Sequence, residues 1–314
     1  MSRKTRRSGA KRSYRAWIFV GLVVLVAIFG YFIFTTANSS GGSSPLINQP
    51  VSQTILDQLA GVNTTTLAQV GSGGSGVQIP SSITGSPLTF NGKPEVLYMG
   101  AEFCPYCAAE RWAMIVALDK FGTFTGLQYM QSTGTDVYPN TSTFTFANAT
   151  YTSNYISFVP VEMDTRAETP LQTPTSAQTA LMTAYDSSNG AIPFIDFGNQ
   201  YVIKSSSYVP NVLRVSQNAA GAPLNWTEIA AQLNTPSSVV AQNIDGTANH
   251  IISAICKIDG NQPTSICSQS FATLLSYTPS SSGGQPIAAS AAVSGAAPSA
   301  AAAGFSPSRT SSPA

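Results

Sequence analysis

Residues 99–122 read "MGAEFCPYCAAERWAMIVALDKFG" and decide the predicted fold, because a strand here turns directly into a helix. The segment 94–103, "PEVLYMGAEF", is a short apolar run typical of a buried central strand. The chain from Pro105 to Phe121 then predicts a helix, with proline in the first turn, Ala and Met inside and a glycine after its end. Cys104 and Cys107 stand at this junction, so the stretch places two thiols at a helix N-terminus.

Apolar spacing on either side of this unit predicts the remaining elements. Between the second and third strands, Thr alternates with aromatic residues and predicts an irregular or hairpin-like insertion. The order strand, helix, strand, helix, strand, strand, helix predicts an α/β sheet with helices on its faces, which is similar to the thioredoxin-like arrangement. The strand candidates are 127–132, 156–164 and a hairpin over 191–203, and the helix candidates are 51–62, 175–186, 225–234 and 238–257.

The N-terminus predicts a membrane anchor. Residues 1–15 hold seven of the chain's 15 basic residues, and the next 19, "AWIFVGLVVLVAIFGYFIF", carry no charge. At about 1.5 Å per residue such a helix spans roughly 28 Å, close to the thickness of a bilayer core. A cleaved signal peptide is the alternative, although its apolar region is usually about 7 to 15 residues long. We expect an uncleaved anchor at 16–35, with the basic segment in the cytoplasm and the main domain outside the cell membrane.

Three further regions follow the expected anchor. Residues 36–50 are rich in Ser, Gly and Asn and predict a linker, and 51–277 hold enough apolar residues for one extracytoplasmic domain. Residues 278–314 are rich in Ala, Ser, Pro and Gly and predict a disordered tail. The part beyond the anchor carries eight basic and 14 acidic residues, a net charge of about −6. Such a charge does not indicate a nucleic-acid partner, which requires a clustered basic face.

The Cys-Pro-Tyr-Cys motif predicts a reactive dithiol. The unpaired N–H groups and the dipole at a helix N-terminus favour a thiolate, so Cys104 would be the nucleophile and Cys107 would resolve the mixed disulfide. A zinc site is an alternative, but it would need Cys256 and Cys267, or His250, as further ligands. A static disulfide between the first two cysteines is the other alternative. The redox interpretation is favoured because strand, motif and helix occur together, and it requires no metal or cofactor.

Other residues have predicted roles beside this dithiol. The Ile192–Pro193 peptide bond follows a predicted helix and precedes a predicted strand. In thioredoxin-like proteins a cis-proline at this place lies opposite the dithiol, so we expect this bond to be cis. Glu102 precedes the first cysteine by two residues and is a candidate to shuttle a proton for the resolving thiol. Glu110 and Arg111 follow on the helix, where we expect a solvated face or an ion pair. Tyr98 is expected to belong to the core.

The other two cysteines, Cys256 and Cys267, flank a turn-forming segment, "KIDGNQPTSI". Outside the cytoplasm, two cysteines across a turn most simply form a structural disulfide. An electron relay to the first pair is the alternative.

Several separated segments together resemble a known family: "GAEFCPYCAAERWAMIVALDKFGTF", "YPNTSTFTF", "AIPFIDFGNQY" and "ICKIDGNQPTSIC". The chain resembles the membrane-anchored, thioredoxin-like family catalogued as domain of unknown function 929, found in archaea and some bacteria. This resemblance covers about residues 51–277 and implies a thioredoxin fold outside the cell membrane, with no assigned activity.

More broadly, the chain looks like the thioredoxin and DsbA superfamily, which implies nucleophilic, resolving and cis-proline roles for Cys104, Cys107 and Pro193. Two features depart from that pattern. Phe103 stands where thioredoxins often have Trp, and 89 positions separate the first cysteine from the proline. Substrate preference is therefore not implied.

Two functional hypotheses follow. The first is a membrane-tethered thiol-disulfide oxidoreductase that acts on exported proteins and exchanges electrons with a membrane redox partner; oxidase, isomerase and reductase share this chemistry. The second is a non-catalytic surface binding module on a thioredoxin scaffold, in which Cys104 and Cys107 form a fixed bridge. The reactivity of the Cys104 thiol distinguishes the two.

Overall fold

The computed structural model describes residues 44–185 and 190–276, all within one unit of the chain. The expected basic segment, membrane anchor and C-terminal tail lie outside the described residues, as does most of the expected linker. Among the helices that the structure describes, none is both long enough and apolar enough to cross a membrane.

A mixed sheet forms the centre of the described part. Its strands are β1 Ser81–Ser82, β2 Thr89–Phe90, β3 Lys93–Gly100, β8 Ser157–Glu162, β9 Phe194–Phe197 and β10 Tyr201–Lys204. The middle strand, β3, pairs in parallel with β8 and antiparallel with β9, and β10 continues the sheet beyond β9. The two-residue strands β1 and β2 pair with β10 and β3. The prediction of an α/β sheet is confirmed at this level.

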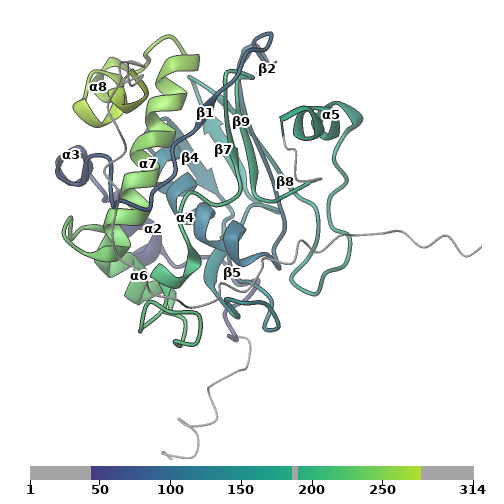
Figure 1. The fold of residues 1–314 in the computed structure, drawn as a ribbon, viewed down its shortest axis with the longest axis vertical. Helices are drawn as coiled ribbons and strands as arrows, with labels where there is room; N and C mark the ends of the chain where they lie inside the picture. Colours follow the sequence, from purple (N-terminus) through teal and green to yellow (C-terminus); the bar gives the residue numbers. More distant parts are fainter. Residues whose placement is uncertain (1–43, 186–189, 277–314) are drawn as a thin grey trace, which may run out of the picture. The chain divides into compact units, whose positions relative to one another are not determined.

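Helices cover both faces of the sheet (Figure 1). Val96 and Tyr98 face the larger core, which contains α4, Pro105–Leu118, and α7, Val239–Ile258. Leu97 and Met99 face a smaller core with residues of α5, Ser176–Tyr185. Because β3 is covered on both sides, its sequence is a continuous apolar run instead of an alternating one.

Helix α4 is buried on nearly all sides, and this corrects the expected solvated face. Glu110 and Arg111 are both 0% exposed. The helix lies between the sheet and α7, so no long side of it reaches water. The helix ends at Leu118, three residues before the predicted end.

The insertion contributes two strands, and each pairs antiparallel with a strand that precedes the insertion in sequence. Strand β5, Gln128–Gln131, pairs with β6, Ser142–Thr145, and β4, Gly122–Thr125, pairs with β7, Thr150–Ser153. Their aromatic side chains extend the core: Phe124 stacks on Phe146 with ring centroids 5.7 Å apart. The expected hairpin-like character is therefore partly right, since the pairing is real but reaches outside the insertion.

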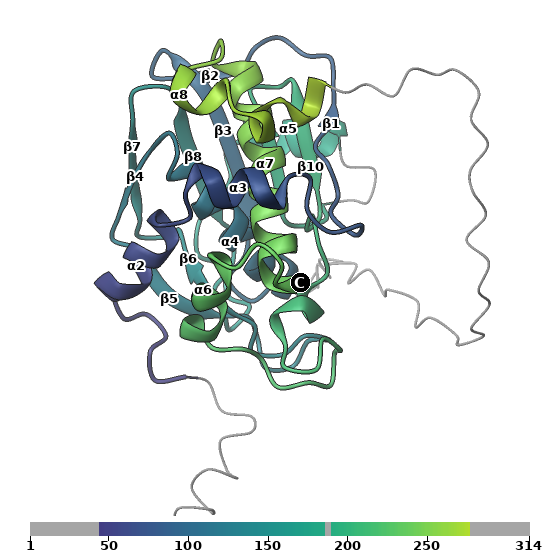
Figure 2. The same cartoon turned by 90° about the vertical axis from the view of Figure 1, so that its left-hand side faces the viewer.

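The remaining elements surround α7 (Figure 2). They are helices α2 Gln53–Ala60, α3 Thr64–Val70, α6 Trp226–Leu233 and α8 Thr264–Cys267, and 3-10 helices η1 Pro210–Leu213 and η2 Ser270–Ser276. A disulfide joins Cys256 on α7 to Cys267 on α8, with Cα atoms 5.5 Å apart.

Candidate functional site

The dithiol lies at the start of α4, immediately beyond the end of β3. Cys104 is the N-cap of the helix, and its Sγ accepts the backbone N–H of Cys107 at 3.3 Å. Pro105 occupies the first turn, where its missing N–H leaves no helical bond unmade. The local sequence thus aims the first sulfur at the open N–H groups of the helix.

Both thiols are nearly inaccessible to water, yet their environments shift their pKa values in opposite directions. Cys104 is 6% exposed and Cys107 is 0% exposed. Hydrogen bonding from the Cys107 side chain, helped by backbone N–H groups and the charge of Arg111, lowers the pKa of Cys104 although burial opposes it. Burial, followed by the interaction with Cys104, raises the pKa of Cys107 well above its ordinary value. The first thiol is therefore the one that ionises.

The predicted proline lies across from this sulfur. The Ile192–Pro193 bond is cis, and the Cys104 thiol donates to the Ile192 carbonyl oxygen at 3.8 Å, a long contact for a weak donor. The Pro193 carbonyl accepts the backbone N–H of Ser205 at 2.8 Å. The loop before β9 is thus held beside the dithiol, on the β9 side of β3.

Glu102 lies close by in sequence, but its carboxylate has other partners. It accepts from Thr145 Oγ1 at 2.7 Å and from the backbone N–H of Arg166 at 3.2 Å. Its backbone N–H pairs with the Asp164 carbonyl at 2.9 Å, which places it on the β8 side of β3. The proton-shuttle role of Glu102 stays a prediction.

A buried ion pair stands behind the dithiol. Arg111 Nη2 lies 2.6 Å from Glu162 Oε2, its Nε donates to Glu162 Oε1 at 2.8 Å, and both side chains are 0% exposed. The same guanidinium donates to the Ala101 carbonyl at 2.7 Å and lies 5.8 Å from the centre of the Tyr98 ring. The positive charge of Arg111 acts to lower the pKa of both thiols, but at Cys107 burial outweighs it, and at Cys104 it adds to the larger effect of the hydrogen bond from Cys107.

A second buried carboxyl holds a neighbouring loop on α4. Glu110 accepts the backbone N–H of Ser207 at 2.7 Å and its hydroxyl at 2.9 Å. Tyr208 OH donates to the Ala109 carbonyl at 2.6 Å. Burial raises the pKa of Glu110 to about 7, against the hydrogen bonds from Ser207.

Of the predicted site residues, the structure brings Cys104, Cys107 and Pro193 together and leaves Glu102 turned away. Sequence reasoning missed Arg111 and Glu162 as neighbours of the dithiol. The spacing of Arg111, four residues after Cys107 and so on the same helix face, was an available signal. The sequence held no comparable signal for Glu162, because its position depends on the β3–β8 register, in which Glu162 lies opposite Gly100.

The structure also bears on the zinc and relay alternatives. Cys256 and Cys267 are bonded to each other, so they are not free to join the dithiol as metal ligands. The part of the chain that the structure describes holds no cluster of three or more His, Cys, Asp or Glu suited to a metal.

The disulfide lies at the opposite end of the sheet from the dithiol. Ile258, two residues after Cys256, packs on Gly198 at the far end of β9 from Pro193. Figures 1 and 2 both show α8 at the other end of the sheet from β5 and α6. Thiol exchange requires sulfur-to-sulfur contact, so the two pairs cannot exchange directly in this arrangement.

A comparison with protein families finds one whose description reads "Domain of unknown function (DUF929)", matched by residues 80–257. The match includes the dithiol, the insertion and the loop before β9. No curated protein matches the chain, and no solved structure matches it.

Proposed function

The chain belongs to the family described as "Domain of unknown function (DUF929)", and we propose that it is a membrane-tethered thiol-disulfide oxidoreductase acting on exported proteins. One observation carries the proposal. The Cys104 thiol caps a helix, has a lowered pKa and faces the carbonyl oxygen that precedes Pro193. A structural cysteine needs none of these features.

The arrangement of strands supports a thioredoxin-like fold as part of this proposal. The order β8, β3, β9, β10, with the first pair parallel and the other two antiparallel, fits the thioredoxin pattern that the resemblance implies. The dithiol follows the central strand in the same way. Fold alone assigns no activity, so the proposed activity rests on the two thiols.

The proposed exchange has two balanced steps. Cys104 thiolate attacks a substrate disulfide, the substrate S–S bond breaks, a Cys104–substrate disulfide forms, and the leaving sulfur takes a proton. Cys107 then loses its proton and attacks Cys104 Sγ, which releases the second substrate thiol and leaves a Cys104–Cys107 disulfide. Two electrons pass from the chain to the substrate, and the reverse sequence oxidises a substrate dithiol.

Turnover in either direction requires a second thiol-disulfide partner, which we place in the membrane because the expected anchor holds the chain there. The basic segment, the anchor and the extracytoplasmic position of the main domain belong to this proposal. The reaction needs no metal or organic cofactor, since sulfur atoms carry both electrons.

A redox titration of the full-length chain tests the proposal. The purified chain in detergent is equilibrated in glutathione buffers, and labelling of Cys104 and Cys107 is followed by mass spectrometry. A reversible midpoint between roughly −270 and −120 mV is expected of an exchange catalyst. In cells, Cys107→Ser should trap mixed disulfides with exported proteins, and Cys104→Ser should trap none.

The binding-module alternative has one observation in its favour, the low exposure of Cys104 at 6%. A dithiol that stays oxidised below about −300 mV would indicate a structural disulfide and favour the binding-module alternative. An empty Cys107→Ser pull-down would point the same way.

A further inference from the structure

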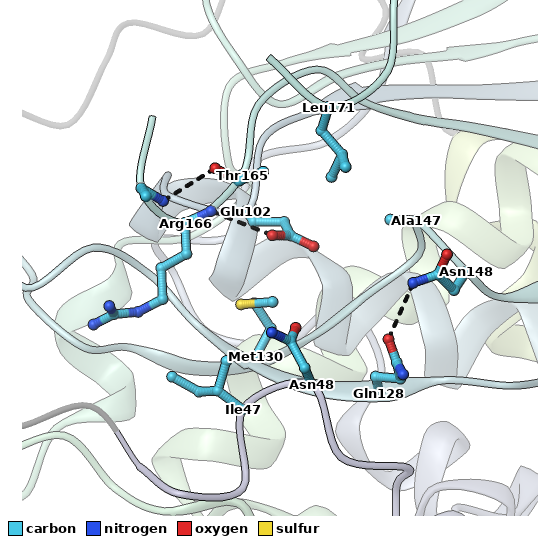
Figure 3. A pocket seen from close by; sticks show the side chains of 11 residues that line it. Ile47, Asn48, Glu102, Gln128, Met130, Ala147, Asn148, Thr165, Arg166 and Leu171 are labelled. Carbon is cyan, nitrogen blue, oxygen red and sulfur yellow. Dashed lines mark hydrogen bonds between the residues drawn. The ribbon is translucent and has the colours of Figure 1, made fainter. Parts of the chain in front are cut away.

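The described part of the chain has a cavity beside the dithiol strand that the proposed exchange does not use. Its volume is about 520 Å³, within the range of roughly 300–1,000 Å³ that is typical of small-ligand sites. Segments far apart in sequence line it: the N-terminal segment at Ile47, strand β5, the turn after β6 and the loop after β8 (Figure 3). Glu102 lies among them.

The Glu102 carboxylate meets this cavity without a cation. It is 7% exposed, and its hydrogen bonds come from neutral donors, the Thr145 hydroxyl and the Arg166 backbone N–H. In the part of the chain that the structure describes, Glu102 forms no salt bridge, and the salt bridge that is present joins Arg111 to Glu162. Because a buried carboxylate is stabilised by a paired cation, an open space beside it favours a cationic ligand.

Arg166 also lines the cavity, but it does not supply that charge. The Arg166 side chain points away from the Glu102 carboxylate, as Figure 3 shows. Its Nη2 donates to Asn140 Oδ1 at 2.7 Å. Among the described residues the Glu102 carboxylate thus has no ion-pair partner, which leaves it open to a positive group on a bound molecule.

The rest of the lining suits a long basic side chain. Asn48, Gln128 and Asn148 bring amide groups to the lining, and Gln128 Oε1, which accepts from Asn148 Nδ2 at 3.2 Å, keeps a second lone pair for an ammonium or guanidinium group. Met130 and Leu171 supply apolar contacts. Lys and Arg combine an apolar stem with a charged tip, so their side chains match both kinds of lining.

The cavity lies on one flank of the dithiol and the cis-proline loop on the other. Glu102 pairs with Asp164 on the β8 side, whereas Ile192 precedes β9 on the opposite side of β3. Glu102 is two residues from Cys104, so their Cα atoms are at most about 7 Å apart. A polypeptide that crosses the dithiol can reach both flanks.

We propose that this cavity binds the Lys or Arg side chain of a polypeptide substrate while a nearby substrate cysteine reacts at Cys104. The proposal rests on the proposed oxidoreductase function and names its substrate class, cysteine-containing polypeptides with a basic residue near the cysteine. Glu102 is then the residue that determines specificity.

The test compares disulfide peptides in which the residues flanking the cysteine are scanned with Lys, Gln and Glu, using the full-length chain in detergent with reduced glutathione to return the Cys104–Cys107 disulfide to the dithiol. We expect a KM about tenfold lower for the best Lys peptide than for its Gln counterpart, which corresponds to about 1.4 kcal/mol. Glu102→Gln should abolish this preference by raising KM for the Lys peptide to that of its Gln counterpart. Glu168→Gln, an exposed carboxylate of the same loop, is the matched control.

Other outcomes separate the two ideas. If Glu102→Gln lowers kcat equally for all peptides while the Lys preference in KM persists, Glu102 acts on the thiols and the cavity proposal is overturned. Exchange without any charge preference also overturns it, and leaves the oxidoreductase function standing. Titration with a cysteine-free Lys peptide requires no thiol chemistry: binding that is lost in Glu102→Gln supports the cavity even if the chain proves redox-inactive, and absence of binding to the unaltered chain counts against it.

Discussion

Arg111 and Glu162 form an ion pair with a 2.6 Å contact, and neither side chain is exposed to water. One comes from α4, four residues after the second cysteine, and the other from the end of β8. The pair fixes a positive charge directly behind the dithiol, in a place where burial alone would disfavour both thiolates.

Removing one partner of this pair should destabilise the fold. Glu162→Gln leaves the Arg111 charge buried without its counter-ion, which typically costs about 3–5 kcal/mol. Urea unfolding followed by fluorescence measures the loss. The double variant Arg111→Met with Glu162→Gln should recover part of it, and a cost equal to the sum of the single variants would show that the pair is not coupled.

The same two substitutions should move the reactivity of the first thiol in opposite directions. Arg111→Met removes the charge that lowers the pKa of Cys104, so that pKa should rise and alkylation near neutral pH should slow. Glu162→Gln removes the partner that offsets this charge, so the pKa should fall and alkylation should quicken. If alkylation of Cys104 became faster in both variants, the substitutions would instead have loosened the packing around the site.

In the unaltered chain, iodoacetamide should discriminate between the two cysteines. The pKa of Cys104 is lowered from 9.0 and that of Cys107 is raised. The pH profile for modification of Cys104 should therefore have its midpoint below pH 9, whereas Cys107 stays unreactive. Mass spectrometry after mild reduction measures both, and unfolded protein, in which the two thiols should react alike, is the control.

Glu110 should make stability depend on pH. Its pKa is raised from 4.5 to about 7 in the folded state, so the folded state holds the proton more tightly than the unfolded state. Its favourable contribution is present below pH 4.5 and is lost as the pH rises to about 7. At full burial the change corresponds to about 3 kcal/mol.

Glu110→Gln keeps a group that can bond Ser207 but does not titrate, so it should flatten this dependence. The comparison is made as the difference between the two proteins at each pH, because other buried carboxyls, among them Asp245 and Asp196, also have a raised pKa. Parallel stability curves for the two proteins would contradict the prediction.

The Cys256–Cys267 bond should act on stability alone. It closes a loop with a sequence separation of 11, for which the chain-entropy effect is about 3 kcal/mol. The double variant Cys256→Ala with Cys267→Ala should lose about that much on denaturant unfolding. The redox midpoint of Cys104 and Cys107 should stay the same, and a changed midpoint would revive the electron relay.

Much of the fold could be predicted from local sequence. The strand around Val96, the helix that begins at Pro105 and the hairpin after Pro193 depend on apolar runs, a proline and turn residues within a few positions of each other. The short helix α3 and strands β4 and β7 were not predicted. The strands are held by pairing with distant segments, and a short Thr-rich stretch has little apolar periodicity of its own.

The sequence by itself determined that two thiols stand at a helix N-terminus after a buried strand, because that requires only neighbours along the chain. The tertiary structure alone decided what surrounds them. The β3–β8 register places Glu162 against Arg111, and the packing of the loop after β8 turns Glu102 toward a cavity instead of the thiols. Both depend on contacts between residues tens of positions apart, and such contacts are set by how the elements pack and not by the local pattern of any one of them.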